Sequence, residues 1–374
     1  MLVALTDQNE RLVLQTSMPK YFLRKLRTDH QFFCPQCKNN VQLKIGTIKI
    51  PHFAHITKSD CEAHFSEGES TQHLLGKEQL YRLFQRLGFR VELESYLPTL
   101  KQRPDLLVKM KDGKLFAIEY QCSPISNEYL LSRNRGYLSE NICPIWIPIT
   151  PRSKEGFSRI TIISLSDQLQ QFIQSTKNQN YLITYNPHLK KFIYFSNLLH
   201  LKNKQFLTKV QMLPIDIQQF PFYLPKNLTR DEFLQYVKTY VGSKENFLKY
   251  RLLISKKGIN DLFLRSIYEL RLNLSSLPSF IGVPIRGNES LGLFAVEWQT
   301  NLFYFVYANR LEIDSLHRQA ILYFLKWANL NITSESIATV RHYCELLKQL
   351  KIQHIYSSVE YEKLVESLYT QFLA

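Results

Sequence analysis

Two short apolar runs joined by a turn, with one carboxylate set into each run, restrict this chain more than any other feature. The runs lie within "RPDLLVKMKDGKLFAIEYQ", residues 103–121, and the carboxylates are Asp105 and Glu119. The turn at 111–113 suits a three-residue hairpin loop in which the last residue, Gly113, has a positive φ. The sequence therefore predicts an antiparallel hairpin that carries two negative charges.

The loop type decides which residues face each other. A three-residue loop pairs Met110 with Lys114, and counting outward then places Asp105 directly opposite Glu119. Gln121 falls on the same face as Glu119 because strand side chains alternate. A two-residue Asp-Gly loop would instead put the two carboxylates on opposite faces. In the first register two like charges oppose each other, which destabilises a sheet, and a Mg²⁺ ion between them would resolve the conflict.

The net charge of the chain favours a polyanionic partner. Of 374 residues, 47 are Lys or Arg and 32 are Asp or Glu, which gives a net charge of +15. Such an excess is typical of proteins that bind nucleic acid or an anionic membrane surface. The alternative is a basic protein with solvated lysine-rich faces. We expect DNA to be the main partner.

We expect neither a membrane-spanning segment nor a signal peptide nor a disulfide framework in this chain. No apolar run approaches the ~20 residues of a transmembrane helix, and "MLVALTDQNER" lacks the basic region of a signal peptide. We therefore expect a cytoplasmic protein without membrane insertion. Its six cysteines argue against a disulfide framework in such a chain.

Cysteines and histidines cluster near the N-terminus. "CPQC" provides Cys34 and Cys37, and after fourteen residues "HFAH" provides His52 and His55. These are ligand types of tetrahedral zinc, and a CxxC knuckle supplies two ligands at once. If the second motif is extended, its two histidines point to opposite faces, one of them binds, and Cys61 becomes the fourth ligand. We expect structural zinc here, with an unmetallated thiol pair as the alternative.

Hydrophobic patterning divides the chain into three regions and predicts the α/β class. Residues 1–65 form a small N-terminal β unit with the zinc-type cluster, and residues 66–150 form a central domain. Residues 151–374 combine a β-meander at 181–214 with a mostly helical region from about 229 onward.

The central domain follows the order α-β-β-β-α-β. Periodic leucines predict a helix over 69–87, and Ser126 is a suitable N-cap for a second helix. Three β-prone runs lie between these helices, and "CPIWIPI" follows the second helix. A helix between the third and fourth strands suits a crossover connection in a mixed sheet.

The carboxylate motif and this order of elements resemble the PD-(D/E)XK nuclease superfamily. "PD" at 104–105 is followed, after thirteen residues, by "EYQ" at 119–121. The resemblance implies that Asp105 and Glu119 hold Mg²⁺ or Mn²⁺, and that the third motif residue orients the attacking water. That residue is Gln121 here instead of lysine. Glutamine supplies no positive charge, but it can hold a water by hydrogen bonds.

Longer segments narrow the resemblance. They are "SEGESTQHLLGKEQLY" (66–81), "QRPDLLV" (102–108), "AIEYQCSPIS" (117–126) and "RNRGYL" (133–138). With "CPQC" and "HFAH" upstream, they resemble the CoiA-like competence proteins, specifically over about residues 1–150 and more loosely beyond. This resemblance implies DNA processing in the natural transformation of Gram-positive bacteria, at or after recombination of incoming single-stranded DNA.

Further candidate residues lie on the two predicted helices. Glu69, His73 and Lys77 are spaced by four residues and share a helical face. With the resemblance, we expect Glu69 to support the metal, His73 to contact DNA, and Lys77 to reach the scissile phosphate in place of the missing lysine. Arg133 and Tyr137 on the second helix are candidates for a phosphate contact. The alternative for both helices is a solvated polar face.

These observations predict a metal-dependent DNA nuclease or DNA-processing protein acting in recombination during natural transformation, on single-stranded or branched DNA. One alternative is a nuclease fold kept as a DNA clamp, with catalysis lost through Gln121. Another is a zinc-stabilised scaffold that recruits recombination proteins through its helical C-terminal region. Metal-dependent cleavage of DNA would separate the first hypothesis from the other two.

Overall fold

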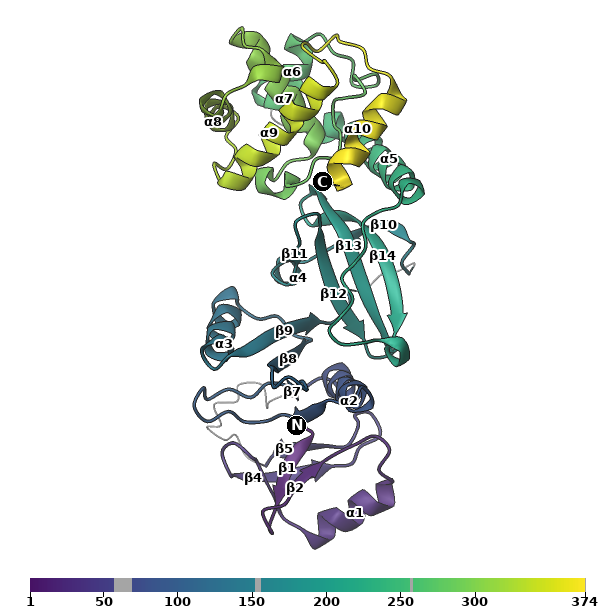
Figure 1. The fold of residues 1–374 in the computed structure, drawn as a ribbon, viewed down its shortest axis with the longest axis vertical. Coiled ribbons are helices and arrows are strands. Elements are labelled where there is room, and N and C mark those ends of the chain that lie inside the picture. Colours follow the sequence, from purple (N-terminus) through teal and green to yellow (C-terminus); the bar gives the residue numbers. More distant parts are fainter. Residues whose placement is uncertain (57–68, 152–155, 256–257, 374) are drawn as a thin grey trace.

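The computed structural model describes residues 1–56, 69–151, 156–255 and 258–373. Within these residues three β-sheets and a helical unit follow one another along the long axis of the molecule (Figure 1). The first sheet lies at one end and the helical unit at the other, so the two remaining sheets form the middle of the molecule.

The N-terminal unit is an antiparallel sheet with one helix. Its strands, in the spatial order β2-β1-β3-β4-β5, are β1 (Val3–Thr6), β2 (Arg11–Val13), β3 (Phe32–Phe33), β4 (Asn40–Lys44) and β5 (His52–His55). The prediction of a purely β unit missed the helix α1 (Lys20–Asp29), which buries Leu23 against the sheet. A signal existed, because Phe22, Leu23 and Leu26 follow helical spacing, but it extends over only ten residues.

The central domain has the predicted order of elements. They are α2 (Thr71–Arg86), β6 (Arg90–Leu93), β7 (Leu106–Lys109), β8 (Leu115–Gln121), α3 (Asn127–Ser139) and β9 (Ile142–Pro148). The sheet order is β6-β7-β8-β9, with β8 and β9 parallel and the other pairs antiparallel. The predicted N-cap is confirmed, because the Ser126 side chain accepts a hydrogen bond from the Tyr129 backbone N–H. The α/β class is confirmed as well.

The β7–β8 hairpin has the register that the three-residue loop predicts. Leu106 pairs with Ile118, and the Met110 N–H donates to the Lys114 carbonyl at 2.9 Å. Gly113 has a φ of +87°, a conformation that glycine adopts without steric cost. Continued by one residue, this register sets Asp105 opposite Glu119.

Helix α2 packs unusually close to β8 at Gly76. A Cβ atom at this position would lie 2.0 Å from Cε1 of Tyr120, whose side chain is fully buried. Glycine inside a helix costs about 1 kcal/mol relative to alanine. The close approach of helix and strand explains why glycine occupies this position.

The third sheet contains the predicted β-meander. In the order β10-β14-β13-β12-β11, its strands are β10 (Ile160–Ser164), β11 (Gln174–Ser175), β12 (Asn180–Asn186), β13 (Lys191–Lys202) and β14 (Gln205–Pro214). A short helix, α4 (Asp167–Gln170), precedes β11. Tyr185 and Phe192 on this sheet share one hydrophobic core with Leu74 and Ile118 of the central domain. The sheet is therefore packed directly onto the central domain.

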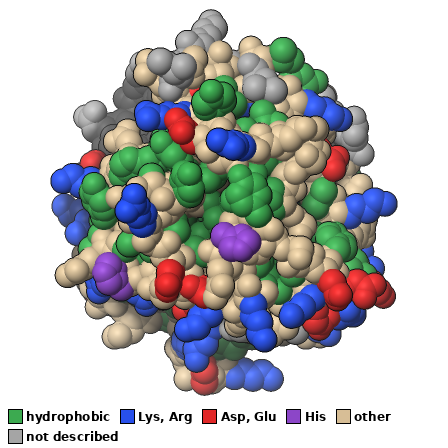
Figure 2. All heavy atoms as spheres, turned by 90° about the horizontal axis from the view of Figure 1, so that it is seen from above, with side chains coloured by type: hydrophobic (Ala, Val, Ile, Leu, Met, Phe, Trp, Pro, Cys, Tyr) green, Lys and Arg blue, Asp and Glu red, His purple; other side chains and the backbone are tan. Residues whose placement is uncertain are grey.

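The C-terminal unit is helical, as predicted. Its helices are α5 (Arg230–Ile254), α6 (Leu262–Glu269), α7 (Ala295–Ala308), α8 (Arg318–Trp327), α9 (Ser334–Gln349) and α10 (Tyr361–Leu373). Short 3₁₀ helices span Ile215–Ile217, Gly258–Asn260, Asn288–Leu291 and Ile313–Ser315. Figure 2 looks onto this end of the molecule and shows hydrophobic side chains exposed among those of Lys and Arg. None of the helices in the described part of the chain combines the length and apolar character needed to cross a bilayer.

Candidate functional site

A pocket of about 380 Å³ opens between α2, the β7–β8 hairpin and α3. Most of the predicted site residues line it together. They are Glu69, His73, Lys77, Asp105, Glu119, Gln121 and Arg133. Segments that are far apart in the sequence therefore converge on one concave surface.

Asp105 lies just before β7 and is fixed by three groups. The Tyr120 backbone N–H donates to Asp105 Oδ2 at 2.9 Å, and His73 Nε2 lies 3.2 Å from the same oxygen. The Lys77 ammonium is 3.6 Å from Asp105 Oδ1. Burial works against ionisation of Asp105, but His73 and Lys77 outweigh it and lower the pKa of this carboxyl. Asp105 is therefore an ionised, rigidly held carboxylate.

Glu69, His73 and Asp105 form a cluster that could hold a metal ion. One ligand atom from each lies within 4.8 Å of the others, and His73 Nδ1 is 3.4 Å from Glu69 Oε1. Burial disfavours the charged imidazole, yet Asp105 and Glu69 together raise the pKa of His73 to about 9. The imidazole must lose its proton to coordinate a metal, so proton release would accompany metal binding.

Lys77 is a buried counter-ion. Its side chain is 1% exposed, and its ammonium donates to Glu69 and, at 2.5 Å, to Glu94. Glu69 also accepts from the amino group of Met1 at 2.7 Å. The Lys77 ammonium is enclosed by carboxylates and neutralises them in this structure. The predicted contact between Lys77 and the scissile phosphate stays a prediction.

Glu119 is held by α3. Its Oε1 accepts hydrogen bonds from Nη2 of Arg133 and from the Tyr137 hydroxyl. Arg133 Nη2 also donates to the Arg103 carbonyl at 3.1 Å. Burial raises the pKa of Glu119 although Arg133 opposes this shift. Arg133 and Tyr137 are buried, so in this structure they hold a carboxylate and do not present the free phosphate contact that we expected.

Each of the two opposed carboxylates therefore has its own cationic partners within the protein. Asp105 is paired with His73 and Lys77, whereas Glu119 is paired with Arg133. Among the described residues, the cluster of metal-ligand atoms includes Asp105 but not Glu119. An ion shared by both carboxylates stays a prediction, and the structure offers Glu69 and His73 as the nearer companions of Asp105.

Gln121 ends β8 at the edge of the pocket. Its Nε2 donates to the Ser123 carbonyl and lies 3.4 Å from the Ser123 hydroxyl. The side chain is therefore oriented by the turn that follows the strand. Its predicted contact with a water stays a prediction.

The N-terminal cluster brings together Cys34, Cys37 and His55. Their ligand atoms lie within 4.8 Å of one another, and Cys37 Sγ is 3.3 Å from His55 Nε2. Burial lowers the pKa of His55, which favours the neutral imidazole that binds metals. His52 is not part of the cluster, and its Nδ1 lies 2.9 Å from the Ile50 carbonyl instead. Strand alternation separates the two histidines, as the sequence allowed. Cys61, the alternative ligand, lies outside the described residues.

Two residues of the site were missed by sequence reasoning. Glu94 is 3% exposed and accepts from the Leu2 backbone N–H at 3.0 Å as well as from Lys77. A signal existed, because Glu94 directly follows the β-prone residues of β6. Gln36, between the two cysteines, also lines the Asp105 pocket. No sequence pattern indicated that the cysteine knuckle would reach this site.

Comparison with known proteins gives a consistent result along the chain. Three family models match: Competence protein CoiA, N-terminal domain, at residues 15–64; its nuclease-like domain at 69–227; and its C-terminal domain at 237–369. The chain is 30% identical to Competence protein CoiA of Bacillus subtilis (strain 168) over 279 residues, which cover 74% of this chain and 72% of the relative. No solved structure matches the chain.

Proposed function

Since the chain belongs to the CoiA family of competence proteins, we propose that it is a metal-dependent deoxyribonuclease of the PD-(D/E)XK type that processes DNA during natural transformation. The observation that carries this proposal is the convergence of Glu69, His73 and Asp105 in one pocket with Glu119 and Gln121. These five residues all lie within the segment matched by the nuclease-like family model.

The donor set fits a divalent cation. Glu69, Asp105 and His73 would hold it, and two carboxylates with one imidazole suit Mn²⁺ better than Mg²⁺, which prefers oxygen ligands alone. Such an ion supplies charge stabilisation at the phosphate and lowers the pKa of a bound water. Mg²⁺ remains compatible with the carboxylates through its own waters.

The residues of the chain prepare this pocket for a phosphodiester. The Tyr120 N–H fixes the orientation of Asp105, and Arg133 with Tyr137 fixes Glu119. Lys77 places the positive charge that Gln121 lacks within the same cluster. Gln121 then contributes orientation of the water by its amide, which helps catalysis without changing the charge of the site.

A DNA clamp without strong catalysis is the second candidate. It is favoured by the pairing of every carboxylate described above with a protein cation, because such a site is stable without a metal ion. In that case the pocket would bind a DNA strand and present it to recombination proteins. The zinc-stabilised scaffold that only recruits such proteins would bind DNA weakly or not at all.

The test is incubation of the full chain with labelled single-stranded, duplex and branched DNA in the presence of Mn²⁺, Mg²⁺ or no added divalent cation. We expect cleavage with Mn²⁺ and none without an added cation. Asp105→Asn removes a metal ligand and should lower the rate on the order of a thousandfold, which corresponds to about 4 kcal/mol. Asp112→Asn, in the exposed hairpin loop, is the matched control and should cleave like the wild type.

Two outcomes would contradict the nuclease proposal. Equal cleavage by wild type and Asp105→Asn would assign the activity to another site or to a contaminant. Binding without cleavage by either protein, under every metal tested, would favour the clamp instead.

A further inference from the structure

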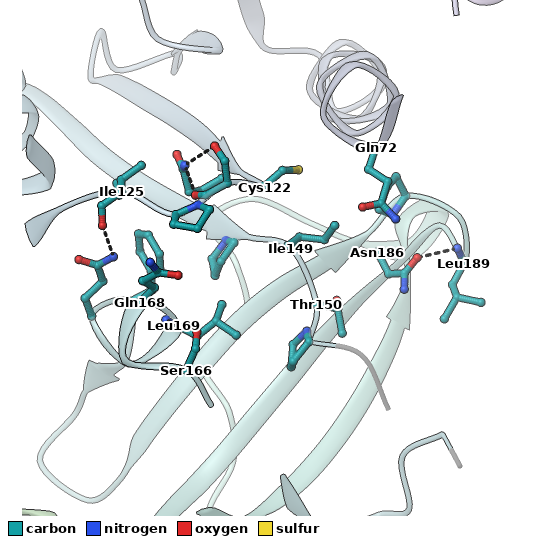
Figure 3. A pocket seen from close by; sticks show the side chains of 18 of the residues that line it. Gln72, Cys122, Ile125, Ile149, Thr150, Ser166, Gln168, Leu169, Asn186 and Leu189 are labelled. Atoms are coloured by element: carbon teal, nitrogen blue, oxygen red, sulfur yellow. Dashed lines mark hydrogen bonds between the residues drawn. The ribbon is translucent and has the colours of Figure 1, made fainter. Parts of the chain in front are cut away.

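A second and larger pocket, of about 730 Å³, lies beside the first. Figure 3 shows this pocket between the ends of the central sheet and the third sheet. Gln72 of α2 lies on one side of it and Gln168 of α4 on the other. Gln121 and Pro148, the last residues of the parallel strands β8 and β9, both line it. The carboxyl ends of parallel strands are a common place for ligand binding in α/β sheets.

The two pockets share one wall. Gln121 lines both of them, so a ligand that extends past this side chain would occupy both pockets at once. A nucleic acid strand is such a ligand, since it carries charged phosphates and neutral bases in alternate positions along its length.

The lining chemistry of the two pockets is opposite. Among the lining residues that the structure describes, the larger pocket has no Lys, Arg, His, Asp or Glu, although the chain has a net charge of +15. It contains five carboxamides instead, from Gln72, Gln121, Gln168, Gln171 and Asn186. Prolines and the rings of Phe157 and Phe172 provide apolar walls. The described part of this lining offers no cation to a phosphate, and its amides and rings match a neutral, planar group with hydrogen-bonding edges.

Three of the carboxamides are already held by the protein. Gln121 donates to the Ser123 carbonyl, and Gln171 Nε2 donates to the Ile125 carbonyl at 3.3 Å. Asn186 Oδ1 accepts from the Leu189 N–H at 3.1 Å. In the described part of the chain, no hydrogen bond engages the amides of Gln72 and Gln168. These two side chains each offer a donor and an acceptor to a ligand.

The pocket also contains a thiol, Cys122, which suggests a reactive cysteine as a different use. Burial raises the pKa of Cys122 to about 12. The thiol is therefore protonated near neutral pH and is a poor nucleophile. Cys122 forms part of the neutral wall.

We propose that this pocket binds unpaired nucleobases of a single DNA strand whose backbone lies in the Asp105 pocket. Carboxamides hydrogen-bond base edges in protein–DNA contacts, and aromatic rings provide surfaces on which bases stack. A base in a duplex is paired and stacked, so it reaches such a pocket after strand separation or in single-stranded DNA. This inference rests on the proposed function for the Asp105 pocket, and it adds that the substrate is single-stranded at the site.

The experiment compares the binding of two probes without added divalent cation and without chelator, so that cleavage is not supported and a zinc ion in the N-terminal unit is kept. One is a short labelled oligothymidylate, and the other is the same backbone with every base replaced by an abasic tetrahydrofuran. Wild type should bind the base-bearing strand more tightly. The double variant Gln72→Ala/Gln168→Ala should bind that strand about three- to tenfold more weakly per lost amide, with its affinity for the abasic strand unchanged. Gln211→Ala, an exposed amide on β14 outside the pocket, is the control.

The outcomes separate this inference from the nuclease proposal. Equal binding of both probes by wild type, or an equal loss for both probes in the double variant, would overturn the base pocket. If the base preference is present while DNA is never cleaved, the pocket stands and the nuclease proposal fails. If DNA is cleaved without any base preference, the nuclease proposal stands and the base pocket fails.

Discussion

The thiol cluster of Cys34, Cys37 and His55 and the carboxylate cluster of Glu69, His73 and Asp105 are neighbours, since Gln36 from the cysteine knuckle lines the pocket of the second cluster. They differ in how the charge of their ligand groups is neutralised. The carboxylate cluster has Lys77 within it as a buried counter-ion. The thiol cluster contains two soft ligands and an imidazole whose pKa is lowered.

This difference predicts two roles for bound metal. An ion bound by the thiol cluster would contribute its binding energy to the folding of the small β unit. A pocket whose carboxylates are already matched by protein cations folds without one, and an ion entering it must displace a proton or a salt bridge. We therefore expect removal of metal to unfold the N-terminal unit but to leave the central domain intact.

The largest expected effect is on the thiol cluster. Cys34→Ser should lose zinc and unfold the N-terminal unit, because structural zinc contributes about 10–16 kcal/mol of binding energy that is available only to the folded site. Zinc content and limited proteolysis measure this. Cys143→Ser, on β9 outside the cluster, should keep its zinc. If protein purified without chelator contains no zinc, the thiol cluster is not a structural zinc site and its contrast with the carboxylate cluster fails.

The next effect concerns the counter-ion. Lys77→Met leaves the carboxylates of Glu69, Glu94 and Asp105 buried with less opposing charge, which should lower the free energy of unfolding by about 3–5 kcal/mol. Mn²⁺ should recover part of this loss, since it restores positive charge to the cluster, and it should raise the melting temperature of the variant more than that of the wild type.

The exposed Lys109→Met on β7 is the matched control for this change, and it should cost less than about 0.5 kcal/mol. An equal loss in both variants would mean that Lys77 does not neutralise the cluster. The contrast with the thiol cluster would then disappear.

A smaller effect tests the contact that positions the carboxylate cluster. Gly76→Ala should destabilise the protein by about 1–3 kcal/mol, because the new methyl group overlaps the ring of Tyr120. Gly242→Ala, within α5 and with open space around it, should instead stabilise by up to about 1 kcal/mol. Chemical denaturation of both variants measures the two signs. The same sign in both would show that α2 does not depend on its close approach to β8.

The smallest effect concerns charges outside both clusters. Helix α1 exposes Arg24 and Lys25, and we expect DNA affinity to fall steeply with salt because the chain is basic. If these residues contact phosphates, Arg24→Gln/Lys25→Gln should reduce the log–log salt slope by about 0.7 per lost contact on single strands. An unchanged slope would confine the DNA contacts to the two pockets, and affinity that is flat with salt would point to a protein partner.

Local sequence patterns predicted those parts of the fold that depend on interactions between residues close together in the chain. The loop at 111–113 defined the register of β7 and β8 because a turn acts on adjacent residues. The N-cap at Ser126 and the meander at 181–214 were equally local. Helix α1 was missed although its apolar residues follow helical spacing, because the pattern covers only ten residues between β-prone runs.

By itself, the sequence determined the order of helices and strands in the central domain and the hairpin register that sets Asp105 opposite Glu119. It also determined which types of metal-ligating residue lie near the N-terminus. The tertiary structure decided which cation neutralises each carboxylate, which histidine joins the cysteines, and that Gln72 and Gln168 border one pocket. The reason is physical. Periodicity and turn chemistry act between adjacent residues, whereas charge pairing, burial and pocket shape depend on distances between segments that meet only when the helices and sheets pack.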